Sequence, residues 1–298
     1  MRKANYLVKV VVAGVLLALL ATGCNVDREW ITSRDPSAAE AQEEAQEQAA
    51  YYAIKGSPEL DAAARKYQGY VDGQSELLVD RTEEFVAAVE AGNVKESKKL
   101  YAPSRVPWER IEPIAEKFGT LDPEVDAREG DVPDRKWTGY HRIEQALWVE
   151  DTTRGQDEYA AELLSDVERL ERKVDEVKLQ ASDPVFGAVE LLNEVSATKI
   201  TGEEERYSHT DLYDIAANVE GAKVAFEFVK PAVKRQDPAL VAEIETRFED
   251  VEQEIEPYRR GDGWVSYEKV DKNERRALSQ KIDALAEPLS RVGRALNR

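Results

Sequence analysis

The chain has few of the residues that most readily reveal a protein's chemistry, since its 298 residues include one cysteine and two histidines. A lone cysteine cannot form an internal disulfide, so Cys24 needs another role. The H-E-x-x-H pattern, which places two imidazoles and a general base on one helix, is absent. No stretch combines period-two alternation with β-branched residues and hairpin turns, so we predict essentially no sheet.

Basic residues are also scarce relative to acidic ones: 41 Lys and Arg stand against 60 Asp and Glu, a net charge of −19. Removing residues 1–23 takes away three basic residues, which leaves 38 against 60 and a net charge of −22. Such a surface repels nucleic acid and raises the local concentration of cations. We therefore predict no nucleic-acid partner. Solubility or a salt-adapted host would account for the acidity equally well.

The N-terminal residues have the features of an export signal. Three basic residues precede an apolar run over 10–21, which matches a secretory h-region and is short for a membrane span. The segment resembles a bacterial lipoprotein signal, with Cys24 as the lipidated first residue of the mature chain, although Ala21 and Thr22 depart from the commonest pattern. We predict that residues 1–23 are removed and that the protein is lipid-anchored outside the cell membrane or periplasmic. A chance cysteine after an ordinary signal peptide is the alternative.

The rest of the chain divides into a tether and a helical domain. Residues 24–50 are rich in Ala, Glu and Gln and poor in large apolar residues, which predicts a tether. Residues 51–298 show helical periodicity, with apolar residues at alternating spacings of four and three. These residues are Leu163, Val167, Leu170, Val174 and Val177; Leu212, Ile215, Val219, Ala222 and Phe226; and Leu278, Ile282, Leu285, Leu289, Val292 and Leu296. They predict an all-α fold of antiparallel helix bundles.

Local start and stop signals support the helical interpretation. Asp271 with Glu274 three residues later predicts a capping box, and Gly92 follows a long helix that begins near Pro58. Pro103 and Pro107 predict a break in the chain, after which Pro107 or Trp108 opens a short helix.

Two short segments repeat one pattern: Trp108–Glu112 and Tyr140–Glu144 each read aromatic residue, ligand-capable residue, Arg, Ile, Glu. On a helix, the i, i+3 spacing points the two ligand-capable side chains of each segment the same way. Two such helices facing each other would bring together His141, Glu144, Glu109 and Glu112. One imidazole and three carboxylates form a nitrogen and oxygen set that can hold a metal cation. A solvated acidic face and a simple His–Glu hydrogen bond are the alternatives.

The segments flanking these helices supply further candidates. The loop Leu121 to Lys136 is dense in Asp and Glu, contains Asp126, and can fold the two short helices together. Thr138 is the expected N-cap of the second helix.

A polar turn before a helix that begins near Asp211 holds the second histidine. One of Glu203, Glu204 and Glu205, or His209, could complete the coordination shell, and we take Glu204 and His209 as additional candidates. The alternative is that His209 and Asp211 only order the start of the helix.

The run over 137–148, with its G-x-H-x-x-E motif, resembles the imelysin-like family, in particular its iron-uptake lipoproteins of the EfeO and EfeM type. Segments 108–112, 126–129, 203–212 and 284–289 are similar as well, so the resemblance covers about residues 58 to 298. It implies two packed four-helix bundles and a component that captures iron for a membrane permease, often beside a secreted haem peroxidase. The metal residues that it implies are Glu109, Glu112, Asp126, His141 and Glu144.

Longer members of that family add an N-terminal cupredoxin-like domain with copper ligands, where this chain has the tether. We therefore predict no copper site and no enzymatic activity of its own. A mostly carboxylate set with one imidazole suits iron, manganese or zinc better than copper(I), and its charge favours ferric iron. A metallopeptidase and a binding lipoprotein for an acidic polysaccharide are the alternative functions.

Overall fold

The computed structural model describes residues 56–297. The predicted signal peptide over 1–23, the lipidation site at Cys24 and the tether over 24–50 lie outside the described residues. Within the described part of the chain, no helix is both long and apolar enough to cross a membrane.

The described residues are almost entirely helical, which confirms the all-α prediction. The long helices are α3 (Pro58–Glu90), α4 (Val94–Ile111), α6 (Gly139–Val149), α7 (Asp157–Glu176), α8 (Ser182–Ala197), α9 (Asp211–Gln236), α10 (Pro238–Ile255) and α11 (Lys272–Ser290). The shorter elements are η1 (Glu112–Phe118), α5 (Leu121–Asp126), η2 (Asp134–Lys136), η3 (Lys199–Thr201), η4 (Glu256–Tyr258), η5 (Tyr267–Lys269) and α12 (Val292–Leu296). Strands β1 (Arg259–Arg260) and β2 (Gly263–Trp264) form one small antiparallel hairpin.

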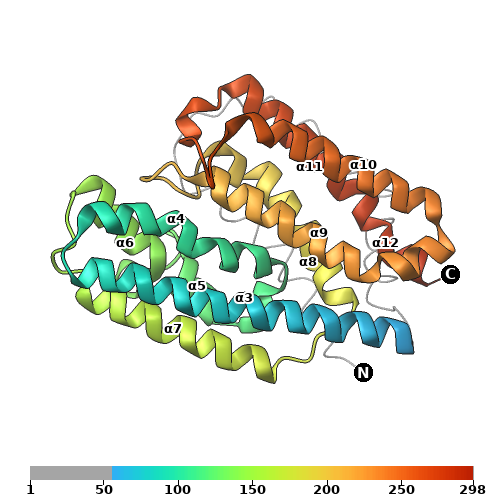
Figure 1. Cartoon of the computed structure of the whole chain (residues 1–298), viewed down its shortest axis with the longest axis horizontal. Helices are drawn as coiled ribbons and strands as arrows, with labels where there is room; N and C mark the ends of the chain where they lie inside the picture. Colours follow the sequence, from blue (N-terminus) through green and yellow to red (C-terminus); the bar gives the residue numbers. More distant parts are fainter. Residues whose placement is uncertain (1–55, 298) are drawn as a thin grey trace. The chain divides into compact units, whose positions relative to one another are not determined.

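The long helices pack into two groups of four (Figure 1). In the first group α3 contacts α4 and α7, and α6 contacts both α4 and α7, so the four helices close a ring. In the second group α8, α9, α10 and α11 close a ring in the same way. The groups meet where α9 packs against α3 and α4. This arrangement agrees with the expected pair of four-helix bundles.

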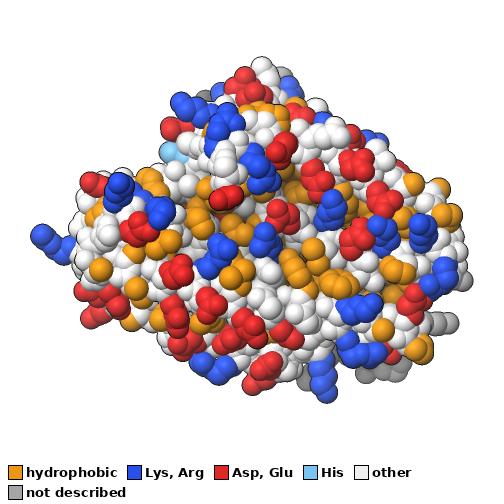
Figure 2. Space-filling model, in the orientation of Figure 1, with side chains coloured by type: hydrophobic (Ala, Val, Ile, Leu, Met, Phe, Trp, Pro, Cys, Tyr) orange, Lys and Arg blue, Asp and Glu red, His pale blue; other side chains and the backbone are white. Residues whose placement is uncertain are grey.

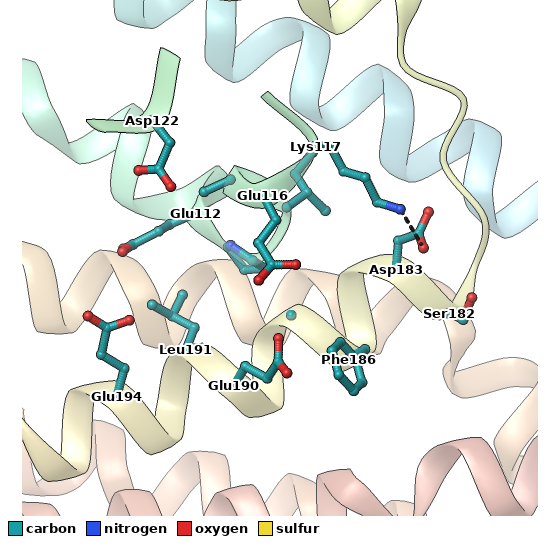
Figure 3. Close-up of a pocket in the computed structure, with 14 residues that line it drawn as sticks. Glu112, Glu116, Lys117, Asp122, Ser182, Asp183, Phe186, Glu190, Leu191 and Glu194 are labelled. Atoms are coloured by element: carbon teal, nitrogen blue, oxygen red, sulfur yellow. Dashed lines mark ion pairs between the residues drawn. The ribbon is translucent and has the colours of Figure 1, made fainter. Parts of the chain in front are cut away.

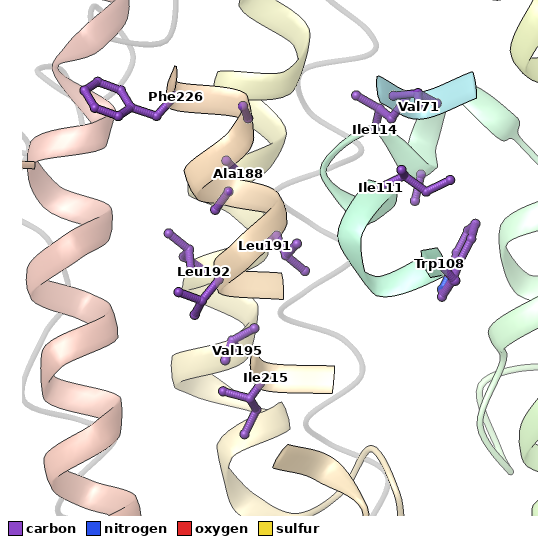
Figure 4. Close-up of a cluster of buried hydrophobic side chains, with 14 of the residues drawn as sticks. Val71, Trp108, Ile111, Ile114, Ala188, Leu191, Leu192, Val195, Ile215 and Phe226 are labelled. Atoms are coloured by element: carbon purple, nitrogen blue, oxygen red, sulfur yellow. The ribbon is translucent and has the colours of Figure 1, made fainter. Parts of the chain in front are cut away.

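The apolar residues that the periodicity selected lie in the core, except Val177 and Leu296, which are only partly buried. Trp108 on α4 and Phe226 on α9 are among the largest fully buried side chains. Figure 4 shows Ile215 on α9 near Leu192 and Val195 on α8, within the second bundle. Fully burying a side chain of this kind stabilises the fold by about 1.5–3 kcal/mol.

Two of the predicted helix ends are confirmed. Helix α3 begins at Pro58, and Gly92 follows its end with φ at +73°, a conformation that glycine adopts without steric strain. At the start of α11, the Asp271 carboxylate accepts from the Glu274 amide at 3.0 Å, and the Glu274 carboxylate accepts from the Asp271 amide at 2.7 Å. These reciprocal bonds form the predicted capping box.

The predicted break at Pro103 and Pro107 is wrong, because α4 continues through both prolines. Pro107 lacks the N–H that would bond to the Pro103 carbonyl. That carbonyl instead accepts from Nη1 of Arg81, on α3, at 3.1 Å. The side chain of a neighbouring helix therefore replaces the missing backbone donor. The predicted loop from Leu121 to Lys136 is also partly wrong, since it begins with α5.

Candidate metal centre

A cluster of buried polar side chains lies where the two bundles meet. Its members come from α4, η1, α5, α6, η3, α9 and the turn before α9. Those at most 3% exposed are Arg105, Glu109, His141, Glu144, Lys199, Glu204, Glu205, Asp211, Asp214 and Asn218. Burying charge is unfavourable unless partners compensate it. A concentration of this size in a helical core is therefore a candidate functional site.

Gly139 lets the start of α6 approach the end of α5. Its φ is +78°, and a Cβ atom there would lie 2.3 Å from the Val125 carbonyl oxygen. Thr138 is the N-cap residue of α6, as predicted, but its hydroxyl donates to the Glu124 carbonyl at 3.1 Å and makes no capping bond to the helix. This close approach brings Asp126, the last residue of α5, to the imidazole of His141. Glycine in the G-x-H-x-x-E motif therefore has a steric purpose.

The His141 imidazole is oriented by Glu144, as the i, i+3 spacing predicts. His141 Nδ1 lies 3.0 Å from Glu144 Oε2. The other oxygen of Glu144 accepts from the backbone amides of Tyr207 at 3.0 Å and Ser208 at 2.7 Å. Both oxygens of Glu144 are thus engaged, and the ring has one fixed orientation.

The other ring nitrogen of His141 faces carboxylates. Nε2 lies 3.6 Å from Asp126 Oδ1, beyond hydrogen-bonding distance, and 4.0 Å from Glu204 Oε1. It has no hydrogen-bond partner among the described residues. Burial and Arg105 lower the pKa of His141, but its contacts with Asp126 and Glu144 outweigh them and raise that pKa to about 10. Binding a metal at Nε2 therefore requires the release of a proton.

Arg105 is the central cation of the cluster. Its guanidinium lies 2.6 Å from Glu109 Oε1 and 2.8 Å from Glu205 Oε1, and it also pairs with Asp126. Burial opposes its charge, but these carboxylates outweigh burial and raise the pKa of Arg105 well above its usual value. Burial likewise raises the pKa of Asp126, yet Arg105 and His141 outweigh it and hold that pKa far below the usual range.

Lys199 is the second buried cation. Its Nζ lies 2.8 Å from both oxygens of Glu112, 3.3 Å from Glu109 Oε2 and 3.5 Å from Glu204 Oε1. The Asn218 amide donates to Glu109 Oε2 at 3.0 Å and to Glu112 Oε2 at 2.8 Å. One ammonium and one amide therefore hold the two carboxylates of the first motif at the same point.

Carboxyl groups outnumber cationic side chains in the cluster. Its carboxyl groups are Glu109, Glu112, Asp126, Glu144, Glu204, Glu205, Asp211 and Asp214, whereas its permanent cations are Arg105, Lys199 and the half-buried Arg128, whose Nη1 lies 2.8 Å from Glu204 Oε2. Burial, reinforced by neighbouring carboxylates, raises the pKa values of Glu205 and Asp214 well above normal and that of Asp211 to about 7. Protons or an added cation can compensate this excess.

The structure brings most of the predicted candidates together. Ligand atoms of Asp126, His141 and Glu204 all lie within 4.8 Å of one another, as do those of His141, Glu144 and Glu205. Glu109 and Glu112 adjoin these groups through Lys199, which also contacts Glu204.

The second histidine lies outside this cluster. The His209 side chain is 41% exposed, and its Nε2 lies 4.0 Å from Glu268. Of the three consecutive glutamates, Glu204 and Glu205 are buried, whereas Glu203 is exposed.

Several members of the cluster escaped the sequence analysis, namely Arg105, Lys199, Asp214 and Asn218, whereas Glu205 was one of three glutamates among which the sequence could not choose. For α9 a signal exists, because Asp211, Asp214 and Asn218 recur at i, i+3 and i+7 along one side of the helix. Polar residues at such spacing within a core helix indicate a buried polar stripe. Arg105 and Lys199 carry no comparable signal, since isolated basic residues usually lie at the surface.

An acidic groove of about 310 Å³ lies at the surface between η1 and α8. Its charged lining comprises Glu112, Glu116, Lys117, Asp122, Asp183, Glu190 and Glu194. Figure 3 shows Glu116 and Glu190 pointing toward each other across it. Burial, with help from Asp126, raises the pKa of Asp122 to about 7. Glu112 lines the groove and also contacts Lys199, so this residue belongs to both the groove and the buried cluster.

The chain matches known proteins over most of its length. The imelysin family model, which carries the name of a peptidase family, matches residues 63–292. An EfeM/EfeO family lipoprotein of Staphylococcus haemolyticus is 44% identical over 241 residues, which cover 78% of this chain and 83% of that protein. The iron uptake system components EfeO of Escherichia coli K12 and Shigella flexneri are each 43% identical to this chain over 237 residues. The matched residues cover 78% of this chain and 63% of each of these relatives, so the chain spans less than two thirds of their length. The chain therefore belongs to the imelysin family, within its EfeM/EfeO group.

Proposed function

We propose that this protein is an extracytoplasmic, lipid-anchored component of an iron uptake system, which captures iron and delivers it to a membrane permease. The observation that carries the proposal is His141 Nε2, which faces Asp126 and Glu204 without a hydrogen-bond partner among the described residues. The names of the relatives agree, since two are iron uptake components and one is a lipoprotein.

The donor set suits the proposed cargo. Asp126, His141 and Glu204 would supply two carboxylate oxygens and one imidazole nitrogen, with Glu109 and Glu112 close by. Hard and borderline cations such as iron, manganese and zinc prefer such ligands. The excess of carboxylates favours ferric over ferrous iron, because the higher charge gains more from anionic ligands. The proposed cargo is therefore iron, with zinc or manganese as substitutes in vitro and no copper.

The acidic groove would serve as the approach to this site. Its carboxyl groups attract cations from solution, and Glu112 lies both at the groove and at the buried cluster. A partly hydrated path of this kind permits release as well as capture, which a transport component needs.

Metal titration of His141→Ala tests the proposal. We expect the affinity for Fe³⁺ or Zn²⁺, measured by calorimetry, to fall at least tenfold, a change of about 1.4 kcal/mol, while the far-ultraviolet circular dichroism stays unchanged. His209→Ala is the matched control, because it removes the other imidazole from outside the cluster. Unchanged affinity in His141→Ala would count decisively against the proposed site.

The anchor and the partners require cellular tests. We expect Cys24→Ser to release the protein from the membrane fraction and to abolish its labelling by palmitate. A membrane iron permease is the proposed recipient, and a secreted haem peroxidase is a further expected partner. Iron uptake by cells that depend on this protein should fall with His141→Ala, provided that the variant reaches the same abundance as the wild type.

The contacts of Glu144 argue against a metallopeptidase. One of its oxygens contacts His141, and the other accepts from the amides of Tyr207 and Ser208. A general base needs an oxygen that can accept a proton from water. Casein incubated with the metal-loaded protein should therefore remain intact. If the protein binds an acidic polysaccharide and this binding persists in the presence of a chelator, the result would instead favour a binding lipoprotein for such a polysaccharide.

A further inference from the structure

We propose that Lys199 is a built-in competing cation, whose ammonium group holds the carboxylates of the metal site and is displaced when the metal binds. The inference rests on the proposed metal-binding function and concerns how the site sets its affinity. Lys199 would then lower the affinity for metal without being a ligand.

The contacts of the Lys199 ammonium support this role. Nζ is within 3.5 Å of oxygens from Glu109, Glu112 and Glu204, and the side chain is 1% exposed. Glu204 Oε1 lies 3.5 Å from Nζ and 4.0 Å from His141 Nε2. A cation bound between Glu204 and His141 would therefore share an oxygen with the ammonium.

Two cations this close repel each other strongly. Water cannot enter a buried site freely, so the repulsion is screened much less than at the surface. Either the ammonium moves away or the metal binds more weakly. In both cases a positively charged Lys199 opposes metal binding.

Lys199 is better suited to displacement than Arg105. Arg105 lies on the long helix α4, and its planar guanidinium pairs with five carboxylates in a fixed geometry. Lys199 is the first residue of the three-residue η3, and its four-carbon side chain is flexible. Gly202, with φ at +89°, ends that turn. The structure thus combines one fixed cation with one movable cation.

This arrangement has a consequence for transport. Without metal, the ammonium keeps Glu109 and Glu112 together despite their mutual repulsion. When the metal leaves, the ammonium can return to the same oxygens, which stabilises the released state. A moderate affinity therefore follows from the protein's own charge.

Zinc titration of Lys199→Met tests the inference, because methionine keeps most of the apolar stem and removes the charge. We expect the Kd for Zn²⁺, measured by calorimetry on the mature chain, to decrease at least tenfold. The matched control is Lys230→Met, since Lys230 also pairs with two carboxylates, Glu227 at 2.8 Å and Glu245 at 2.6 Å, but at the surface. That control should change the Kd less than threefold, and Lys199→Arg, which keeps the charge, should not tighten binding.

Each result is decisive. Unchanged or weaker Zn²⁺ binding by folded Lys199→Met overturns the inference. If that variant is unfolded without metal, Zn²⁺ should restore its helical circular dichroism, because the ion then supplies the missing positive charge; failure to do so also overturns it. If His141→Ala weakens binding but Lys199→Met leaves it unchanged, only the role of Lys199 fails. If the wild type binds no Zn²⁺ through His141, both proposals fail.

Discussion

The cluster around Arg105 and the outer helices α10 and α11 contain the same charged residue types, but these side chains are buried in the cluster and exposed on the outer helices. In the cluster, Arg105 and Glu109 are both fully buried and lie 2.6 Å apart. On α10, Arg247 and Asp250 pair at 3.1 Å with side chains 43% and 37% exposed. Figure 2 shows many such surface charges, with Lys and Arg scattered among Asp and Glu. Surface pairs contribute little to stability, whereas a buried ion that loses its partner is strongly destabilising. We therefore expect substitutions of the buried charged residues, and not of the surface ones, to change both stability and metal binding.

Arg105→Met should produce the largest difference between the two regions. It leaves Glu109, Asp126 and Glu205 without their shared cation, so we expect the free energy of unfolding to fall by about 3–5 kcal/mol. Urea denaturation followed by circular dichroism measures the change. Arg247→Met, which removes an exposed pair, should change stability by about 0.5 kcal/mol or less. Equal effects of the two substitutions would remove the distinction between the regions.

Gly139→Ala should have the next largest effect. The new Cβ would clash with the Val125 carbonyl, and φ at +78° adds strain, so we expect a loss of about 2–4 kcal/mol. Because the clash separates α6 from α5, metal affinity should fall as well. Gly155→Ala is the control: its φ is +79°, but its Cβ would meet nothing within 4 Å, so about 1–2 kcal/mol of strain remains and metal affinity is retained.

Asp122→Asn tests the groove through the pH dependence of stability. The pKa of Asp122 is raised to about 7 in the folded protein, so the folded state binds its proton more tightly than the unfolded state. The Asp122 carboxyl therefore contributes to the free energy of unfolding at about pH 4, and this contribution is lost as the pH rises toward 7. Above that pH the contribution no longer changes. We expect the substitution to stabilise the protein at pH 8 by on the order of 1 kcal/mol, and to flatten the slope of unfolding free energy between pH 4 and 7.

The exposed Asp283 provides the comparison for that experiment. Asp283→Asn should leave the slope between pH 4 and 7 close to that of the wild type. An identical slope in Asp122→Asn and the wild type would show that the groove does not hold this carboxyl in its protonated form.

Asp271→Ala should have a small effect that is confined to the second bundle. It removes the two capping bonds to the amides of Asn273 and Glu274, so we expect a loss of about 1 kcal/mol in thermal or urea unfolding. Asp271→Asn should lose less, because asparagine also caps helices well. Metal affinity should remain that of the wild type in both variants. A drop in affinity would mean that the second bundle and the cluster are coupled.

The sequence identified the two short motifs correctly, but it predicted the helix around the first motif less well. It placed Glu109 and Glu112 on a short helix after a break, because Pro103 and Pro107 normally interrupt a helix. The structure instead extends α4 through both prolines, since Arg81 from α3 supplies a donor to the orphaned carbonyl. That compensation comes from a residue distant in sequence and has no local signal.

The sequence alone determined the helical class, the ends of α3, the capping box of α11 and the facing of His141 and Glu144. These features depend on periodicity, side-chain length and backbone geometry within a few residues. Tertiary structure decided that Glu204 faces the cluster while His209 does not, and that Arg105 and Lys199 lie among the carboxylates. Side-chain direction after a turn, and the burial of a charge, depend on what other helices bring to the same point, which no local pattern records.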